Sequence, residues 1–310
     1  MLWIIFAIIA YFLMAISAVI DDFLLTGPLA KPKLYAFYVS VLGVLVFILA
    51  PFGFTIPDFL TLIIALLSGA LWFFALLGLF ESLRLFEASR VIPAIGGFLP
   101  IFTLILSYVF AWQLKQALEP IGLAKILAFL LLVTGGVLIG LGKNRGITKK
   151  SFILSCLTAL LFALSFATAK LVYISLPFIS GLIWIKVGGL LIALLFLFSK
   201  EVKREIFKKK KARLSSFFGK PKIALLFISN QVIGAGAGIL QNFAIFLAPL
   251  SYLAFINAMD GMRYVFLLIF TVILSYKFPQ FLADRVSKQI IMQKIFAVLL
   301  IVAGLILLAI

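Results

Sequence analysis

Long apolar stretches, rather than alternating apolar and polar positions, run along the whole sequence. Charges, prolines and turn residues divide the chain into ten such segments. They lie near residues 1–20, 34–51, 59–81, 88–111, 123–142, 151–172, 178–199, 222–247, 250–276 and 293–310. A helix needs about 20 mainly apolar residues to cross a bilayer, and the strands of a membrane barrel would show polar alternation. The pattern predicts an all-α membrane protein with ten transmembrane helices.

Composition narrows the class further. Of the 310 residues, 65% are hydrophobic and 12% are charged, whereas soluble domains are roughly 45–50% apolar and about 25% charged. The chain contains no histidine, and Cys156 is its single cysteine. A soluble enzyme, a disulfide scaffold, histidine-based catalysis and a zinc cluster are therefore excluded. We expect no catalytic residue, no metal site, no cofactor and no enzymatic activity.

The net charge of +17 is concentrated in particular connections between the segments. The odd-numbered connections hold most of the 27 Lys and Arg, whereas Lys115 and Lys125 are the basic residues of the even-numbered ones. The positive-inside rule predicts cytoplasmic odd-numbered connections, both termini outside, and location in the cytoplasmic membrane. The run Lys208–Lys211 fits a loop that faces lipid headgroups. We expect membrane lipids as partners and no nucleic acid, because no aromatic residues interleave the run.

The two halves of the chain are similar in sequence. Residues 125–139 match residues 294–308 at eight of fifteen positions, at a spacing of 169, and residues 15–22 pair with 163–170 at a spacing of 148. Repeats of five spans each must be inverted relative to one another, because five is odd. Such repeats are typical of carriers with a site at the bilayer midplane between the halves. The expected organisation is a first five-helix repeat at 1–142, a basic connecting loop at 143–150 and a second repeat at 151–310, which contains a basic loop at 200–222.

Several passages resemble the drug/metabolite transporter (DMT) superfamily, in particular its EamA-type members with ten spans. They are Ala163–Lys170, Trp184–Lys186, the passage from Ser82–Ser89 to Leu99–Leu106, and the glycine-containing last segment of each half. The resemblance covers nearly the whole chain and implies export or exchange of small metabolites, often amino acids or nucleotide sugars.

The chain departs from this family at two points. The family commonly ends its fourth and ninth spans with Leu-Gly-Glu, where this chain has Phe110-Ala-Trp112 and Leu274-Ser-Tyr276. Familiar members also have cytoplasmic termini, opposite to the orientation that the basic residues predict here.

Polar residues inside spans are candidate site residues, because they are costly in lipid. Lys186 lies about eight residues into its segment, roughly 12 Å deep at helical rise. We expect it to face a central cavity and hold a carboxylate or phosphate; pairing with a neighbouring helix is the alternative.

Asp260 and Arg263 lie three apart on one helical face, either as a self-neutralising pair or as a pair that substrate or a proton opens. Arg263 is then a second substrate anchor and Asp260 the proton-coupling residue.

Further candidates accompany these charges. We expect Gln241, Asn257, Trp184, Trp72 and Tyr38 to contact substrate, although interhelical hydrogen bonding and simple packing explain such residues equally well.

Helix-breaking residues interrupt the fourth segment. A break or hinge is expected there, at Pro93, Gly96, Gly97 and Pro100.

These features favour a secondary transporter of a small polar or amphipathic metabolite, amino acid-like or anionic, that works as an exporter or exchanger by alternating access. A flippase for lipid or polyprenyl phosphate on the same scaffold is the main alternative, followed by a membrane enzyme and an assembly role. The sequence leaves open the substrate, proton coupling, and whether the protein is a monomer or a homodimer.

Overall fold

The computed structural model describes residues 2–25, 32–86, 88–115, 121–141, 149–198, 221–277 and 288–309. Residues 143–148 of the expected connecting loop and residues 200–220 of the expected basic loop lie outside the described residues. All regular structure in the described ranges is helical. The α-helices are α1 (Leu2–Leu25), α2 (Pro32–Leu42), α3 (Phe59–Leu85), α4 (Ala88–Gln113), α5 (Leu123–Gly140), α6 (Lys149–Ser175), α7 (Phe178–Phe196), α10 (Pro221–Leu247), α11 (Leu253–Ala258), α12 (Gly261–Lys277) and α13 (Lys288–Ala309), and the 3₁₀ helices are η1 (Gly43–Phe52) and η2 (Leu250–Tyr252).

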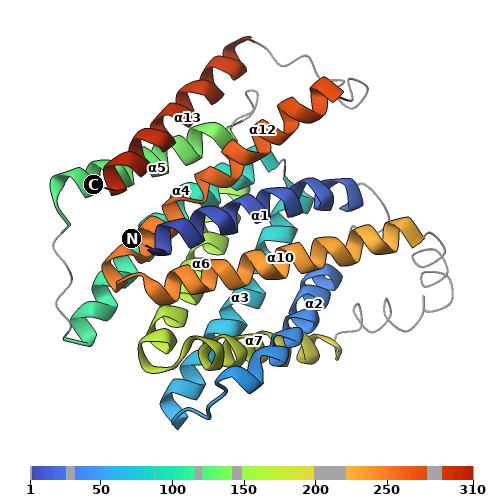
Figure 1. The fold of residues 1–310 in the computed structure, drawn as a ribbon, viewed down its shortest axis with the longest axis vertical. Helices are drawn as coiled ribbons and strands as arrows, with labels where there is room; N and C mark the ends of the chain where they lie inside the picture. Colours follow the sequence, from blue (N-terminus) through green and yellow to red (C-terminus); the bar gives the residue numbers. More distant parts are fainter. Residues whose placement is uncertain are drawn as a thin grey trace.

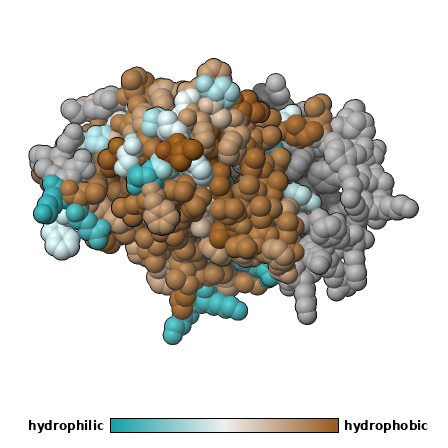
Figure 2. Space-filling model, turned by 90° about the horizontal axis from the view of Figure 1, so that it is seen from below, coloured by the Kyte–Doolittle hydropathy of each residue, from teal (hydrophilic) through white to brown (hydrophobic). Residues whose placement is uncertain are grey.

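The prediction of an all-α fold is confirmed for the described residues. Seven helices there are long and apolar enough to cross a membrane, and two shorter apolar helices, Ala36–Phe52 and Leu123–Ile139, accompany them. Many large apolar side chains are exposed, among them Phe52, Trp112 and Phe198, and Figure 2 shows a face dominated by apolar residues. A soluble monomer rarely exposes so large an apolar surface. These features are consistent with a multi-pass membrane protein.

Three helix pairs with distant sequence positions form the framework. α1 packs along α10, α3 along α6, and α5 along α13 (Figure 1). α7 packs on α3, and α4 packs on α6. In Figure 1, α5 and α13 lie at one end of the molecule and α7 at the other. This arrangement places α2, α3, α6 and α7 around one region, which contains the pocket described below.

Glycines allow α3 and α7 to approach very closely. A Cβ atom added to Gly69 of α3 would lie 1.9 Å from the carbonyl oxygen of Ile185, and one added to Gly188 of α7 would lie 2.2 Å from the carbonyl oxygen of Leu66. The two backbones are therefore in direct contact, as at other close crossings of membrane helices. This contact fixes the position of Lys186, which follows Ile185 in α7.

The fourth segment contains the four residues at which a break or hinge is expected. α4 is one continuous helix through Pro93, Gly96, Gly97 and Pro100, and the side chain of Pro93 is not among those described. A proline removes one backbone hydrogen bond, and the contacts of α4 with α5, α6 and α11 hold the helix on several sides. A role of these residues as a hinge stays a prediction.

The chain breaks in the ninth segment instead. α11 ends at Ala258, residues 259 and 260 form a turn, and α12 begins at Gly261. A Cβ atom on Gly261 would lie 2.9 Å from the Cα atom of Gly136 in α5. The turn is therefore packed closely against α5, and it holds Asp260 in a partly buried position.

Candidate functional site

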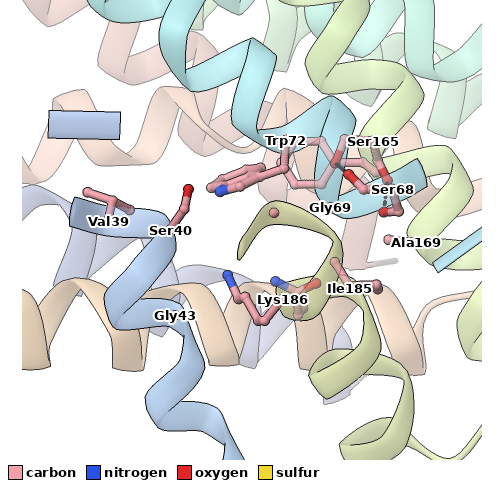
Figure 3. Close-up of a pocket in the computed structure, with 13 residues that line it drawn as sticks. Val39, Ser40, Gly43, Ser68, Gly69, Trp72, Ser165, Ala169, Ile185 and Lys186 are labelled. Atoms are coloured by element: carbon pink, nitrogen blue, oxygen red, sulfur yellow. Dashed lines mark hydrogen bonds between the residues drawn. The ribbon is translucent and has the colours of Figure 1, made fainter. Parts of the chain in front are cut away.

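A small pocket lies among α2, η1, α3, α6, α7 and α10 (Figure 3). Its cavity volume is about 30 Å³, room for about two water molecules. The residues that line it are Val39, Ser40, Gly43, Ser68, Gly69, Trp72, Ser165, Phe166, Ala169, Ile185, Lys186, Gly189 and Asn242. Six helical elements thus contribute residues to this pocket.

Lys186 is the charged residue of this pocket. Its Nζ atom lies 5.6 Å from the centroid of the Trp72 ring, within the range of a cation–π interaction. A Cβ atom on Gly43 would lie 3.4 Å from Cδ of Lys186, so the aliphatic stem lies against the α2–η1 junction. Among the described residues, no carboxylate pairs with this ammonium group. A cation in an apolar interior without a counter-ion is energetically costly, which is typical of a functional residue.

The other polar groups of the pocket differ in whether they already have a partner. The Ser68 hydroxyl donates to the carbonyl oxygen of Ser165 at 2.9 Å, and the Ser165 hydroxyl donates to that of Ser68 at 2.9 Å. Asn242 donates to the carbonyl oxygen of Gly238 at 2.8 Å and accepts from the Tyr173 hydroxyl at 2.9 Å. These groups are satisfied within the protein and hold α3, α6 and α10 together.

Ser40 is different. Its hydroxyl oxygen is buried and has no hydrogen-bond partner among the described residues, although its side chain lines the pocket. Figure 3 shows the Ser40 oxygen, the indole nitrogen of Trp72 and the Lys186 ammonium on the side of the pocket next to α2. A buried polar group without a partner is rare and calls for an explanation. A ligand group or water in the pocket would satisfy it.

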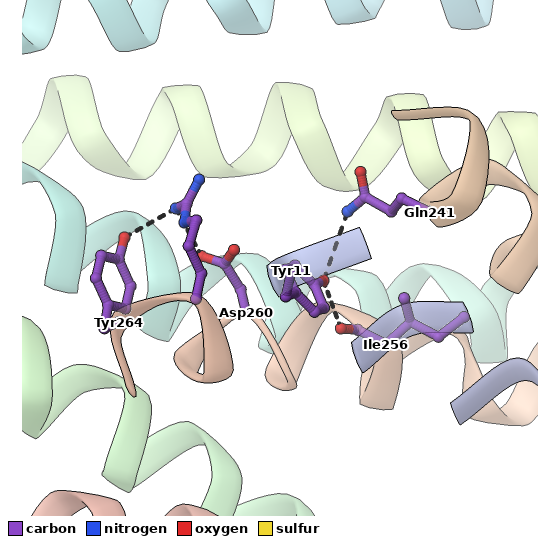
Figure 4. Close-up of polar contacts among 6 residues, drawn as sticks. Tyr11, Gln241, Ile256, Asp260 and Tyr264 are labelled. Carbon is purple, nitrogen blue, oxygen red and sulfur yellow. Dashed lines mark hydrogen bonds and ion pairs between the residues drawn. The ribbon is translucent and has the colours of Figure 1, made fainter. Parts of the chain in front are cut away.

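A second polar group surrounds the turn between α11 and α12 (Figure 4). Nη2 of Arg263 lies 3.0 Å from Oδ2 of Asp260 and 2.9 Å from the hydroxyl oxygen of Tyr264. Asp260 directly precedes α12, where a negative charge is favoured by the helix dipole. Nε of Arg263 is buried and has no partner in the described part of the chain. The guanidinium therefore retains unused donors beside its ion pair.

Further hydrogen bonds join helices of the two halves beside this turn. The Tyr11 hydroxyl donates to the carbonyl oxygen of Ile256 at 2.7 Å, and Nε2 of Gln241 lies 3.5 Å from the Tyr11 oxygen. Nδ2 of Asn257 donates to Oγ1 of Thr103 at 2.9 Å. These contacts link α1, α10, α11 and α4 next to the broken span.

The structure divides the expected site residues into two groups. Lys186 and Trp72 line the pocket, whereas Arg263, Asp260, Gln241 and Asn257 belong to the polar groups around α11 and α12. The two cations expected to hold one substrate together are therefore not in one cavity.

Two expected aromatic contacts lie outside both groups. Tyr38 is exposed, and it precedes the residues that line the pocket. The Trp184 indole donates to the carbonyl oxygen of Thr55 at 3.0 Å and stacks on Phe54. In this conformation Trp184 makes packing contacts within the protein. A role of Trp184 or Tyr38 in substrate binding stays a prediction.

Sequence reasoning missed Ser40, Tyr11 and Tyr173 as partners of these sites. Each is a single hydroxyl in an apolar segment, and such residues are common in membrane helices. Lys170 also has a partner that the sequence did not predict: its Nζ donates to the carbonyl oxygen of Phe246 at 3.0 Å, in the last turn of α10. A cation near a helix C-terminus is stabilising.

The described residues contain no group of three or more His, Cys, Asp or Glu side chains placed to hold a metal ion.

Comparisons with known proteins bear on the fold alone. No family model and no curated protein matches this chain. One solved structure, described only as "Crystal structure of protein", is similar over 98% of this chain and 97% of its own, with a TM-score of 0.67 and 12% sequence identity. At this identity the likeness shows a shared fold and no activity.

Proposed function

We propose that the protein is a secondary transporter for a small polar or amphipathic metabolite that works by alternating access. The Lys186 pocket is its substrate site. The observation that carries the proposal is an ammonium group inside an apolar helical bundle, in a pocket that also contains the buried hydroxyl of Ser40. Within the described ranges of the chain, neither group has an ion-pair or hydrogen-bond partner. A structural lysine would be expected to have a carboxylate or carbonyl partner, as Lys170 has.

The packing of the helices supports two inverted five-helix repeats and ten spans. At the spacing of 169 defined by the last segments, Gly69, Leu71, Phe74 and Ala75 of α3 recur as Gly238, Leu240, Phe243 and Ala244 of α10. The contact of α1 with α10 then corresponds to that of α3 with α6, and α5 and α13 pair with each other. Repeats arranged in this way are typical of secondary carriers.

The two matching glycines have different surroundings, and this difference supports a two-state mechanism. Gly69 is in backbone contact with α7, whereas a Cβ atom added to Gly238 would meet no heavy atom within 4 Å. If the halves exchange conformations during transport, α10 closes on α2 in the other state as α3 closes on α7 in this one. The pocket lies between these two crossings and would open to alternate sides.

The remaining assignments follow from the same proposal. The Asp260–Arg263 pair is a separate coupling site that exchanges a proton, and the broken span around it resembles the discontinuous helices of known carriers. The odd-numbered basic connections face the cytoplasm, and the protein resides in the cytoplasmic membrane.

A thermal-shift screen followed by transport assays tests the proposal. The purified full-length protein is screened with monocarboxylates, amino acids, nucleotide sugars and lipid phosphates, since ligand binding to the folded state raises the melting temperature. Stabilising compounds are then tested for uptake into proteoliposomes that contain wild type or Lys186→Met. Uptake by wild type and its loss in Lys186→Met would support the proposal. Stabilisation without uptake in either direction would contradict a carrier, and stabilisation by lipid phosphates alone would favour the flippase.

A further inference from the structure

We infer that the Lys186 pocket binds the carboxylate of an organic monoanion, rather than a zwitterionic amino acid, a phosphate ester or a cation. The inference rests on the proposed function, since it assigns a substrate class to the same site. The charges, donors and walls of the pocket each contribute to it.

The charge of the pocket matches one negative charge. Among its thirteen lining residues, Lys186 is the charged one, and none is Asp or Glu. A monoanion neutralises the ammonium group, whereas a phosphate dianion would leave one negative charge without a partner in a medium of low dielectric constant. A zwitterion would bring an ammonium group for which the lining offers no carboxylate. A cation would be repelled by Lys186.

The hydrogen-bonding groups of the pocket without a partner in the described part of the chain can all donate. Lys186 offers three N–H donors and no acceptor. Ser40 has a buried hydroxyl without a partner, and in the described part of the chain no acceptor is found for the indole N–H of Trp72. The carbonyl and hydroxyl groups of Ser68 and Ser165, by contrast, satisfy one another. A carboxylate, with two oxygens and about four lone-pair directions, matches such a set.

The remaining lining residues favour a ligand whose other part is compact, flat and apolar. Val39, Phe166 and Ile185 supply apolar side chains, and Gly43 and Gly189 leave part of the wall without a side chain. The indole of Trp72 also lines the pocket and supplies an aromatic contact for a planar group. The present volume of about 30 Å³ accommodates only the carboxylate group of the ligand. The pocket must therefore widen before the apolar part of the ligand can bind.

Benzoate is a suitable first probe, because its neutral and differently charged relatives have nearly the same shape. The full-length protein in detergent is titrated with benzoate, benzamide, phenylalanine, phenyl phosphate and benzylamine, and the melting temperature is followed. We expect benzoate to raise the melting temperature most, and benzamide and benzylamine to have no effect. Lys186→Met should abolish the benzoate response, and Lys150→Met, the same substitution at an exposed lysine, should leave it unchanged.

Ser40→Ala provides a second test that keeps the charge of the pocket. It removes a hydroxyl without a protein partner, so the fold should tolerate it. We expect the concentration of benzoate needed for half the shift to rise about three- to tenfold, the value of one hydrogen bond. If Lys186→Met does not give a monodisperse protein, Ser40→Ala alone still tests whether benzoate binds in this pocket.

The outcomes separate this inference from the proposed function. If phenylalanine or phenyl phosphate gives a larger Lys186-dependent shift in melting temperature than benzoate, the assignment of a monocarboxylate ligand is wrong. The pocket would then still be the substrate site. If no compound gives a shift that depends on Lys186 or Ser40, the assignment of the pocket itself is wrong.

Discussion

Gln241 and Asn242 are neighbours in α10, but their side chains belong to different polar sites. Nε2 of Gln241 lies 3.5 Å from the Tyr11 hydroxyl, next to the broken ninth segment. Asn242 lines the Lys186 pocket and accepts a hydrogen bond of 2.9 Å from Tyr173. A movement of α10 would therefore change both sites at once.

The separation of these two sites leads to a first prediction. Tyr173→Phe removes the donor to Asn242, so the protein should lose about 1 kcal/mol of stability and bind the pocket ligand more weakly. Tyr11→Phe removes the donor to Ile256 and should lower the melting temperature by a similar amount without changing Lys186-dependent binding. Ligand titrations by thermal shift compare the two variants. Equal losses of binding in both would show that the two sites are not distinct.

A second prediction concerns the Asp260–Arg263 pair. Asp260→Asn or Arg263→Gln alone leaves an uncompensated charge in an apolar interior, which is more costly than removing both charges. The double variant should therefore be more stable than either single one, with a coupling energy of about 1–3 kcal/mol. Melting temperatures in one detergent measure this. Additive effects would mean that the 3.0 Å contact contributes no stability.

The same pair offers a functional readout. If Asp260 exchanges protons, Asp260→Asn should abolish substrate accumulation driven by a pH gradient in proteoliposomes and retain exchange of substrate at equal pH. Loss of both activities would indicate a structural pair, one of the alternatives that the sequence left open.

The all-α fold and the long apolar helices could be predicted because they follow from local properties. The length and polarity of a segment suffice to predict a helix such as α3 or α6. Lys186 could be selected for the same reason, since one charge stands out in an apolar run. Trp72, which lines the same pocket as Lys186, was also among the selected residues, and its contact with substrate stays a prediction.

The grouping of residues could not be predicted, because it depends on which helix faces meet. Nothing in the sequence distinguishes Gln241 from Asn242, which lie about 100° apart on α10 and face different sites. The continuity of α4 through Pro100 could not be predicted either, because it depends on the contacts of α4 with its neighbours, which offset one lost hydrogen bond. Ser40 could not be selected from the sequence, because its place in the pocket depends on how α2 packs against α3 and α7.

A third prediction concerns orientation in the membrane. Cys156 is the single cysteine, so Cys156→Ala gives a background for single-cysteine labelling. Lys150→Cys at the start of α6 and Ser175→Cys at its end are both exposed positions. We expect an impermeant maleimide to label Ser175→Cys in intact cells and Lys150→Cys only after permeabilisation. The opposite pattern would place the basic connections outside and overturn the assignment of both termini.

A fourth prediction concerns the start of α3. Asp58 caps this helix by accepting from the backbone N–H of Thr61 at 3.1 Å, and hydrogen bonds from Thr61 hold the pKa of this carboxyl below its ordinary value of 3.8. The charged form therefore stabilises the fold above pH 3.8, and this contribution is lost as the pH falls through the lowered pKa. Asp58→Asn keeps a capping side chain without the charge. Its melting temperature should lie below that of wild type at neutral pH and approach it as the acid limit is reached. A constant difference over the whole range would show that the charge has no part in the cap.

The two related glycines give the last prediction, which separates stability from transport. Gly69→Ala places a Cβ atom 1.9 Å from the carbonyl oxygen of Ile185, so α3 and α7 must separate and the melting temperature should fall strongly. Gly238→Ala and Gly236→Ala meet no heavy atom within 4 Å, and alanine is favoured over glycine in a helix by about 1 kcal/mol. Both should leave the protein as stable as wild type or more so. Because Gly238 matches Gly69 and is expected to contact α2 in the alternate state, Gly238→Ala should also slow transport, whereas Gly236→Ala should not. Equal transport by these two variants would contradict closure of α10 on α2.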